Sequence, residues 1–269
     1  MACTFCYVPF DGVEGSELTA KRVVDKIAEW PLLNVTFGGG DPLMYPYFCD
    51  LVHYTRTQLG KHVLIQVDTN GIKLGLREIE RLRTDINIIG LPLETTVPGI
   101  ALEMRKNAKH PATVLNLLHT LTNRNVPTKI NTVVTKRNIG ELTSLAETLA
   151  AYPLRVWSLY QFWPVGPVGN QEHTKDIVED QQFMDAVLAV RNAFPSLPVE
   201  RGLIEDRSRS YLFVTQTGRA YTVAAEMNNQ YVELGPIFEP SVLEKWRKHA
   251  DPAANGKRAS DREKVVRVD

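Results

Sequence analysis

Apolar side chains recur along the first part of this chain with two alternating periods, one helical and one strand-like. Ala20, Val24 and Ile27 are spaced by three or four residues, which predicts an amphipathic helix over 17–30. The run Leu33–Phe37 is short, apolar and contains β-branched residues, which is typical of a buried strand. The same patterns continue and predict helix 46–59, strand 63–67, helix 75–83, strand 86–91, helix 112–123, strand 128–134, helix 139–151 and strand 155–162.

This alternation of strands with helices predicts βαβ units and a parallel sheet. Five strands precede residue 165, and one more is expected upstream of Cys3, so we predict an α/β fold with a partial (β/α)6 barrel over 1–165. The segment 166–249 has another pattern and is predicted to be a short α+β C-terminal extension. The polar segment 250–269 is predicted to be a disordered tail. The extension is expected to contain helix 178–194, antiparallel strands 211–214, 219–223 and 231–234, a hairpin turn at Thr217-Gly218, and helix 240–248.

Polar and glycine-rich segments follow the predicted strands at their carboxyl ends. The first strand is followed by Gly38–Asp41, the second by Asp68–Gly71 and the third by Glu94. In barrels of parallel strands the chemistry gathers at this edge. On position alone, Thr69 and Glu94 are therefore candidate substrate contacts.

The composition argues against several classes of protein. Formal net charge is zero over 269 residues, so charge gives no reason to expect nucleic acid or an anionic membrane as partner. No apolar run approaches the ~20 residues that span a bilayer, and the N-terminus does not resemble an export signal. Three cysteines, two of them three residues apart, favour a reducing cytosol and a metal role over a disulfide framework, so we expect a cytoplasmic protein.

Cys3 and Cys6 form a C-x-x-C motif together with the aromatic residues Phe5 and Tyr7. Alone, such a motif fits zinc, a redox dithiol or an iron–sulfur cluster. Zinc would need two more soft ligands, yet the third cysteine, Cys49, is expected to be a core thiol in a helix. The six histidines show no ligand spacing, and we assign none of them a role. A small zinc-stabilised barrel stays open as an alternative.

The motif Cys-Thr-Phe-Cys-Tyr followed by Gly-Gly-Asp-Pro resembles the radical S-adenosylmethionine (SAM) superfamily, whose signature is C-x3-C-x2-C. Cys3 and Cys6 match its second and third cysteines. The first would lie four residues before Cys3, ahead of Met1, so we expect the natural start of the protein to lie upstream. The resemblance implies a 4Fe-4S cluster, held in part by these two cysteines, and SAM as cofactors.

The resemblance also implies which residues bind SAM. Gly39, Gly40 and Asp41 stand where the family has Gly-Gly-Glu, which holds the methionyl amino group of SAM. The aspartate keeps the carboxylate but shortens its reach by one methylene.

Three further positions match SAM-binding positions of the family. Phe5 matches an aromatic residue that packs near the adenine, and Asn131 matches polar groups that reach SAM. Arg105 lies where relatives place an arginine for the SAM carboxylate or ribose. Pro92 departs from the pattern, because several relatives carry a SAM-contacting serine there.

Within the superfamily, the segments 129–134 and 155–162 look most like viperin and its prokaryotic relatives. The resemblance implies that SAM is cleaved reductively and that the deoxyadenosyl radical takes hydrogen from a small substrate, with a nucleotide as the leading expectation. A one-electron donor such as flavodoxin or ferredoxin is implied as partner.

Two alternatives to this function stay open. One is a radical SAM activase that modifies peptides or proteins, although no cysteine after Cys49 could hold the auxiliary clusters of the best-known maturases. The other is a non-catalytic barrel that has lost its cluster and acts as a binding partner.

Overall fold

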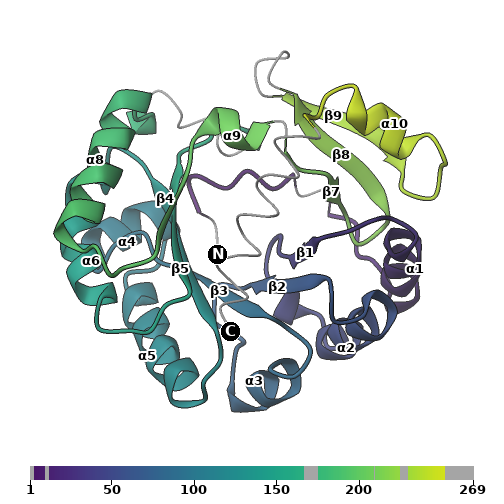
Figure 1. Ribbon diagram of the computed structural model, residues 1–269, viewed down its shortest axis with the longest axis horizontal. Helices are drawn as coiled ribbons and strands as arrows, with labels where there is room; N and C mark the ends of the chain where they lie inside the picture. Colours follow the sequence, from purple (N-terminus) through teal and green to yellow (C-terminus); the bar gives the residue numbers. More distant parts are fainter. Residues whose placement is uncertain (1–2, 10–11, 167–174, 209, 225–229, 252–269) are drawn as a thin grey trace.

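A six-stranded parallel sheet dominates the computed structural model, which describes residues 3–9, 12–166, 175–208, 210–224 and 230–251. The strands follow one another in the order β1-β2-β3-β4-β5-β6, and the sheet curves into a partial barrel with helices on its outside (Figure 1). This arrangement confirms the predicted α/β partial barrel. Its strands are β1 (Asn34–Phe37), β2 (Leu64–Asp68), β3 (Ile88–Pro92), β4 (Thr128–Val134), β5 (Val156–Gln161) and β6 (Val199–Gly202).

The helices that follow these strands begin and end close to the predicted bounds. The predicted helix 139–151 is divided, since it starts as the 3-10 turn η2 (Ile139–Glu141) and continues as α6. The helices are α1 (Glu17–Ala28), η1 (Pro42–Met44), α2 (Phe48–Leu59), α3 (Leu76–Leu82), α4 (Pro98–Arg105), α5 (His110–Asn123), α6 (Leu142–Leu149), α8 (Asp180–Ala193), α9 (Ile204–Ser208) and α10 (Val242–Arg247).

Among the described elements, four were not predicted: β6, α4 and the short helices η1 and α9. The sixth strand of the sheet is β6, which follows α8 and so lies in the segment assigned to the C-terminal extension. Its sequence, Val-Glu-Arg-Gly, carries two charges and no apolar run, so nothing marks it as a strand until it pairs with β5. The strand expected upstream of Cys3 lies outside this sequence and stays a prediction. Helix α4 was also missed, because Pro98 and Gly99 favour a loop although proline at the first helical turn is well tolerated.

The sheet has an outer and an inner face. Alternate residues such as Ile65, Ile89 and Ile130 point outward into the main apolar core beneath the helices. Their neighbours Leu64 and Ile88, together with Val156, form a separate small cluster on the opposite, concave face. We call this concave face the lumen; its base is apolar, and polar side chains follow toward the carboxyl ends of the strands.

The C-terminal region forms a second, antiparallel sheet of β7 (Phe213–Val214), β8 (Arg219–Ala224) and β9 (Gln230–Pro236). The predicted hairpin turn at Thr217-Gly218 joins β7 to β8, with Gly218 at φ +83°. Trp30, just after α1, packs with residues of β8, β9 and α10, so this sheet is fixed to the start of the barrel. In the predicted tail 250–269, only Ala250 and Asp251 belong to the described residues.

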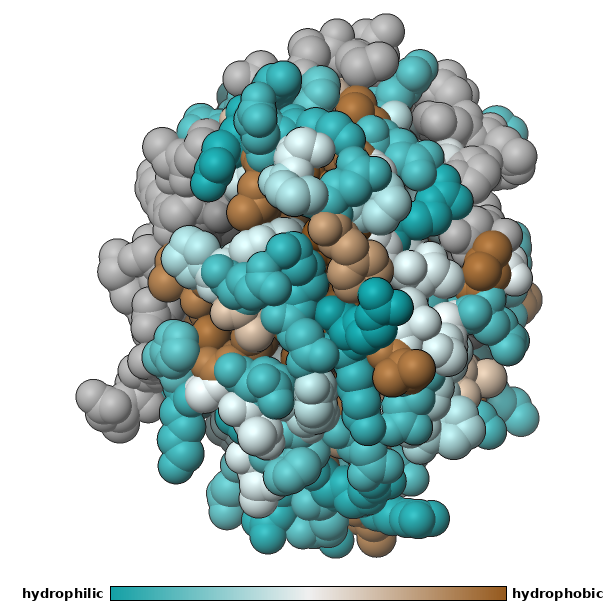
Figure 2. Space-filling view, turned by 90° about the vertical axis from the view of Figure 1, so that its right-hand side faces the viewer, coloured by the Kyte–Doolittle hydropathy of each residue, from teal (hydrophilic) through white to brown (hydrophobic). Residues whose placement is uncertain are grey.

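The face of the molecule that carries α1 and α10 is mostly hydrophilic, with isolated hydrophobic patches (Figure 2). Scattered exposed apolar side chains of this kind are normal on protein surfaces. Among the helices in the described part of the chain, none is both long and apolar enough to cross a membrane.

Candidate active site

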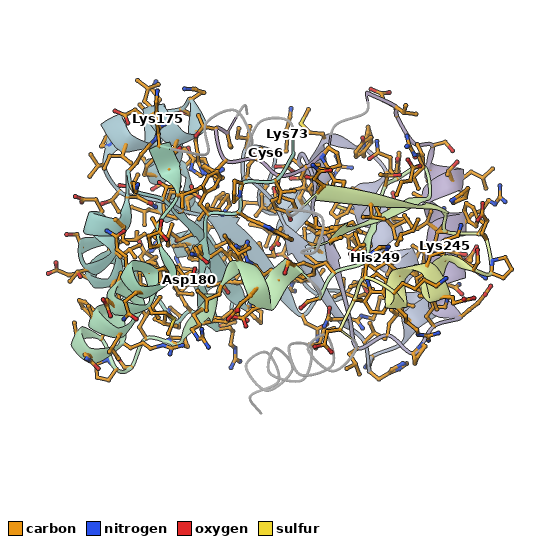
Figure 3. The ribbon with its side chains drawn as sticks, turned by 90° about the horizontal axis from the view of Figure 1, so that it is seen from above. Cys6, Lys73, Lys175, Asp180, Lys245 and His249 are labelled. Atoms are coloured by element: carbon orange, nitrogen blue, oxygen red, sulfur yellow. The ribbon has the colours of Figure 1, made fainter. Side chains whose placement is uncertain are left out.

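The cysteine motif lies in a tight turn at the centre of the molecule. The backbone N–H of Cys6 donates to the carbonyl of Cys3 at 3.3 Å, and both side chains are partly exposed. Thr4, between them, donates its N–H to the carbonyl of Met104 at 3.0 Å. The C-terminal end of α4 therefore holds the cysteine turn in place. Seen from above, Cys6 lies near the middle of the molecule, whereas Lys245 lies toward one side (Figure 3).

A buried ion pair lies beside this turn. Arg105, 6% exposed, donates to both carboxylate oxygens of Glu94, 2% exposed, with Nη2 at 2.7 Å from Oε1. The Nη1 atom of Arg105 lies 3.5 Å from the Sγ of Cys3, and its guanidinium lies 5.2 Å from the centre of the Phe5 ring. Burial raises the pKa of the Cys3 thiol, and the charge of Arg105 opposes that rise. Arg105, Phe5 and Cys3 are thus brought together, as expected, but the carboxylate of Glu94 is engaged with Arg105.

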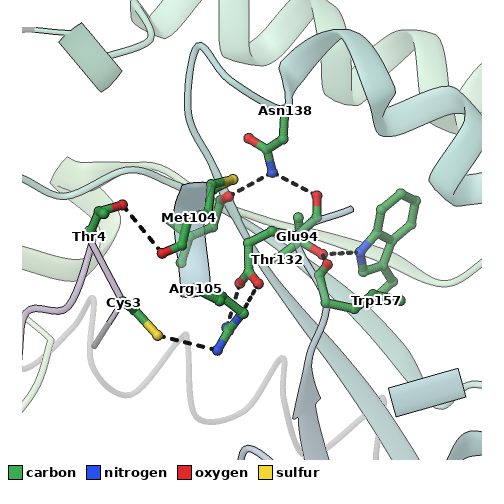
Figure 4. Close-up of polar contacts among 10 residues, drawn as sticks. Cys3, Thr4, Glu94, Met104, Arg105, Thr132, Asn138 and Trp157 are labelled. Atoms are coloured by element: carbon green, nitrogen blue, oxygen red, sulfur yellow. Dashed lines mark hydrogen bonds and ion pairs between the residues drawn. The ribbon is translucent and has the colours of Figure 1, made fainter. Parts of the chain in front are cut away.

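Hydrogen bonds from β4 and from the segment after it hold the loop that carries Glu94. Asn138 donates its Nδ2 to the carbonyl of Glu94 at 2.8 Å (Figure 4). Thr132 of β4 donates to the carbonyl of Leu93 and accepts a hydrogen bond from the indole of Trp157 at 2.9 Å. Consequently the buried pair is held rigidly at the carboxyl end of β3.

The glycine turn after β1 is exposed, and the aspartate that follows it is not. Gly39 has φ +106°, a conformation that favours glycine. The carboxylate of Asp41 accepts hydrogen bonds from the backbone of Leu43 and Asn70 at 3.0 and 2.9 Å, and from the hydroxyl of Thr69. Asp41 and Thr69, predicted to contact SAM and substrate respectively, thus bind each other and join two loops of the site. Gly39 and Gly40 leave their backbone accessible beside them.

Polar side chains of β2, β4 and β5 line the lumen. Asn131 donates its Nδ2 to Asp68 Oδ1 at 3.2 Å, while its own Oδ1 is buried without a hydrogen-bond partner among the described residues. Lys129, 1% exposed, donates to the hydroxyl of Tyr160 at 2.8 Å. Strand alternation in the predicted segment 128–134 places Lys129 on the same face as Asn131. This signal could have identified Lys129 from the sequence.

Aromatic side chains of β7 and of the segment after β5 pack against the cysteine turn. The ring of Tyr7 lies 5.9 Å from that of Phe213 and 6.3 Å from that of Trp163. Tyr7 itself remains 39% exposed, so these contacts cover only part of its side chain. No pattern in the sequence indicated that the extension reaches the cysteine turn.

His110, to which the sequence assigned no role, also lies near the buried ion pair. It is 1% exposed at the start of α5 and is hydrogen-bonded to the backbone of Asn70. Burial, with a further contribution from Arg105, lowers its pKa to about 3. The ring is therefore held neutral behind the site, and its Nε2 has no hydrogen-bond partner among the described residues.

The two thiols fit part of a cluster site. Cys3 and Cys6 supply the soft ligands that cluster iron prefers, at the second and third positions of the expected signature. The first position precedes Met1. Within the described ranges, no group of three or more Cys, His, Asp or Glu residues is arranged to hold a metal ion. With a cluster bound, Cys3 and Cys6 would supply two of its ligands.

Comparison with known proteins identifies the family. A sequence model described as the Radical SAM superfamily matches residues 1–149. Two proteins named S-adenosylmethionine-dependent nucleotide dehydratase, from Flammeovirga pacifica and Lacinutrix mariniflava, are 25% and 26% identical over 90% and 91% of this chain. The match covers 84% of the first protein and 52% of the second. The mycofactocin maturase MftC of Mycobacterium tuberculosis is 24% identical over 56% of this chain and 39% of its own.

Solved structures share the fold. Streptococcus suis SuiB bound to S-adenosylmethionine superposes with a TM-score of 0.70 at 15% identity, covering 95% of this chain and 64% of SuiB. The chain thus spans less than two thirds of SuiB and about half of the second nucleotide dehydratase. The predicted family and cofactors are confirmed: this chain belongs to the radical SAM superfamily, whose members are enzymes that use a 4Fe-4S cluster and SAM.

Proposed function

We propose that this chain is a radical SAM enzyme that acts on a nucleotide, with reaction chemistry of the dehydratase type. The observation that carries the proposal is the extent of the sequence similarity. Two relatives named as nucleotide dehydratases match about nine tenths of the chain, into the small C-terminal sheet. The maturase MftC matches just over half of it. The likeness to SuiB supports the fold alone, since identity is 15%.

One region of the chain would hold the cluster and SAM, and another would hold the substrate. Cys3 and Cys6 would hold cluster iron, and the exposed turn at Gly39 and Gly40 would offer its backbone to the amino group of SAM. Arg105 would offer an N–H donor beside them, because Nη1 faces the cysteine turn while the other guanidinium nitrogens pair with Glu94.

The substrate would bind in the lumen. Asn131 and Lys129 reach it from β4, Tyr160 from β5 and Tyr7 from the cysteine turn. With cluster and SAM bound, reductive cleavage of SAM supplies a deoxyadenosyl radical that removes hydrogen from the substrate. The aromatic rings around Tyr7 would exclude water and other hydrogen donors from that radical. The electron would come from a donor such as flavodoxin or ferredoxin.

Anaerobic reconstitution with iron and sulfide, of this chain and of a version extended upstream of Met1, tests this proposal. We expect Cys3→Ser and Cys6→Ser each to abolish cluster binding. Cys49→Ser should leave the cluster intact, because Cys49 lies in the apolar core. The reconstituted protein is then supplied with reductant and SAM, and with each common ribonucleoside triphosphate in turn. One of the nucleotides should increase deoxyadenosine release.

Two results would count against the proposal. Equal iron loss in all three cysteine variants would remove the cluster assignment. Release stimulated by a peptide library and not by any nucleotide would favour the peptide-modifying alternative, which the match to the maturase MftC keeps under test.

A further inference from the structure

One carboxylate of the lumen has an oxygen that the protein does not use. Asp68 is the last residue of β2, and its Oδ1 accepts hydrogen bonds from Gln66 Nε2 at 2.7 Å and Asn131 Nδ2 at 3.2 Å. Its Oδ2 has no partner among the described residues, and the side chain is partly exposed. Thr69, one residue later, turns instead to Asp41. At the end of β2 it is therefore Asp68 that faces the lumen.

The strand between β2 and β4 is built to leave room for this carboxylate. Gly90 of β3 pairs with Asp68 on one side and with Lys129 on the other. A Cβ at Gly90 would lie 1.8 Å from Asp68 Oδ1 and 2.9 Å from Asn131 Nδ2. Such distances are impossible for real atoms, so the contact between Asp68 and Asn131 depends on a glycine at this position.

The contact also fixes the polarity of Asn131. An ionised carboxylate can only accept hydrogen bonds, so the amide of Asn131 must turn its NH₂ group toward Asp68 and keep its Oδ1 as an acceptor. That Oδ1 is buried and unpartnered within the described chain. Two acceptors, Asp68 Oδ2 and Asn131 Oδ1, thus lie on neighbouring strands. Such a pair suits a ligand that brings hydroxyl or N–H donors.

Positive charge gathers on another part of the lumen wall. Lys129 donates to Tyr160, and the guanidinium of Arg207 lies 5.4 Å from the centre of the Tyr160 ring. A nucleotide carries its negative charge on phosphate and its hydrogen-bond donors on sugar and base. The acceptors near Asp68 therefore match the sugar, and the cations around Tyr160 match the phosphates.

We propose that Asp68 binds a ribose hydroxyl of a bound nucleoside through Oδ2, with Asn131 and Gly90 setting its position. The inference rests on the proposed function where the nucleoside is the substrate. The same chemistry would serve the ribose of SAM, so the experiment separates the two ligands.

The variant Asp68→Asn is the sharpest test. Its Oδ1 can still accept from Gln66 and Asn131, while an NH₂ group replaces Oδ2, so only the lumen-facing atom changes from acceptor to donor. Asp50→Asn is the matched control, because Asp50 lies on α2, 63% exposed, and pairs with Arg81. Titration calorimetry of the full chain would use the four common ribonucleoside triphosphates, S-adenosylhomocysteine, and analogues of each that lack the 2′- or 3′-hydroxyl.

We expect Asp68→Asn to weaken a ribose-containing ligand about tenfold or more. One deoxy analogue should be affected far less, because it has already lost the contact. A loss confined to the nucleotides assigns Asp68 to the substrate, and a loss confined to S-adenosylhomocysteine assigns it to SAM. Asp50→Asn should change neither affinity.

Three results would overturn the inference: equal weakening of every analogue, no weakening of any ligand, or no binding of either ligand class to the unaltered chain. If S-adenosylhomocysteine shows the expected pattern while no nucleotide binds, Asp68 keeps its role and the nucleotide assignment fails.

Discussion

At the scale of single residues, the site depends on a charge pair that water hardly reaches. Arg105 and Glu94 are each more than nine tenths buried, and their separation by eleven residues gives no hint of the pairing. Removing one partner of a buried pair leaves an uncompensated charge, which costs more than the pair contributes.

We therefore predict that Glu94→Gln lowers the free energy of unfolding by about 3–5 kcal/mol. The exposed pair of Arg219 and Glu233 offers the control, and Glu233→Gln should cost far less, because water screens this pair. Urea denaturation of both variants measures the difference. Equal costs would show that burial of the Glu94–Arg105 pair has no energetic consequence.

A second residue-scale prediction concerns pH. The pKa of His110 is about 3 in the folded chain, against 6.5 for an ordinary histidine, so the unfolded chain binds the proton first as pH falls. Stability should therefore decline as pH falls from about 6.5 toward 3. His110→Gln, which does not titrate and keeps an amide near Asn70, should show a shallower decline between pH 7 and pH 5.

Unfolding measured across that range in His53→Gln provides the comparison, because the His53 side chain is 72% exposed. That variant should follow the unaltered chain. Parallel curves for His110→Gln and the unaltered chain would mean that His110 is not held neutral by the fold.

At the scale of elements, strand β3 has a position, Gly90, where packing leaves no room for a side chain. Gly90→Ala should lower the free energy of unfolding by about 1–3 kcal/mol, because the methyl group overlaps the Asp68 carboxylate. The double variant with Asp68→Ala should recover part of that loss. Gly99→Ala in α4 is the control: its Cβ would meet nothing within 4 Å. An additive double variant would show that the two side chains do not compete for the same space.

The sequence predicted the elements whose apolar periodicity is strong. Strands β1 to β5 and their long helices are found near the expected residues because a buried face must repeat along each of them. Strand β6 and helix α4 were not predicted. The strand is stabilised by pairing with β5, and the helix begins with Pro98-Gly99, which favours a loop.

The sequence predicted which residues belong to the candidate site, but not which of them contact one another. Arg105, Phe5 and Cys3 do lie together. The partnership of Asp41 with Thr69 spans 28 residues and depends on two loops meeting, which no local pattern encodes. The burial of His110 likewise follows from packing between helices.

At the scale of the whole molecule, the partial barrel and the small sheet meet at the cysteine turn. This turn is fastened by α4 and packs against aromatic residues of the C-terminal region. The central claim is that a radical formed at this turn removes hydrogen from a nucleotide in the lumen.

Deuterium transfer tests that claim most directly. The reconstituted protein would be given SAM, reductant and the stimulating nucleotide deuterated on its ribose carbons, and the released deoxyadenosine would be analysed by mass spectrometry. We predict that deoxyadenosine gains deuterium from the nucleotide. Deoxyadenosine that forms at the same rate but without deuterium, from a nucleotide labelled at every ribose carbon, would contradict the account.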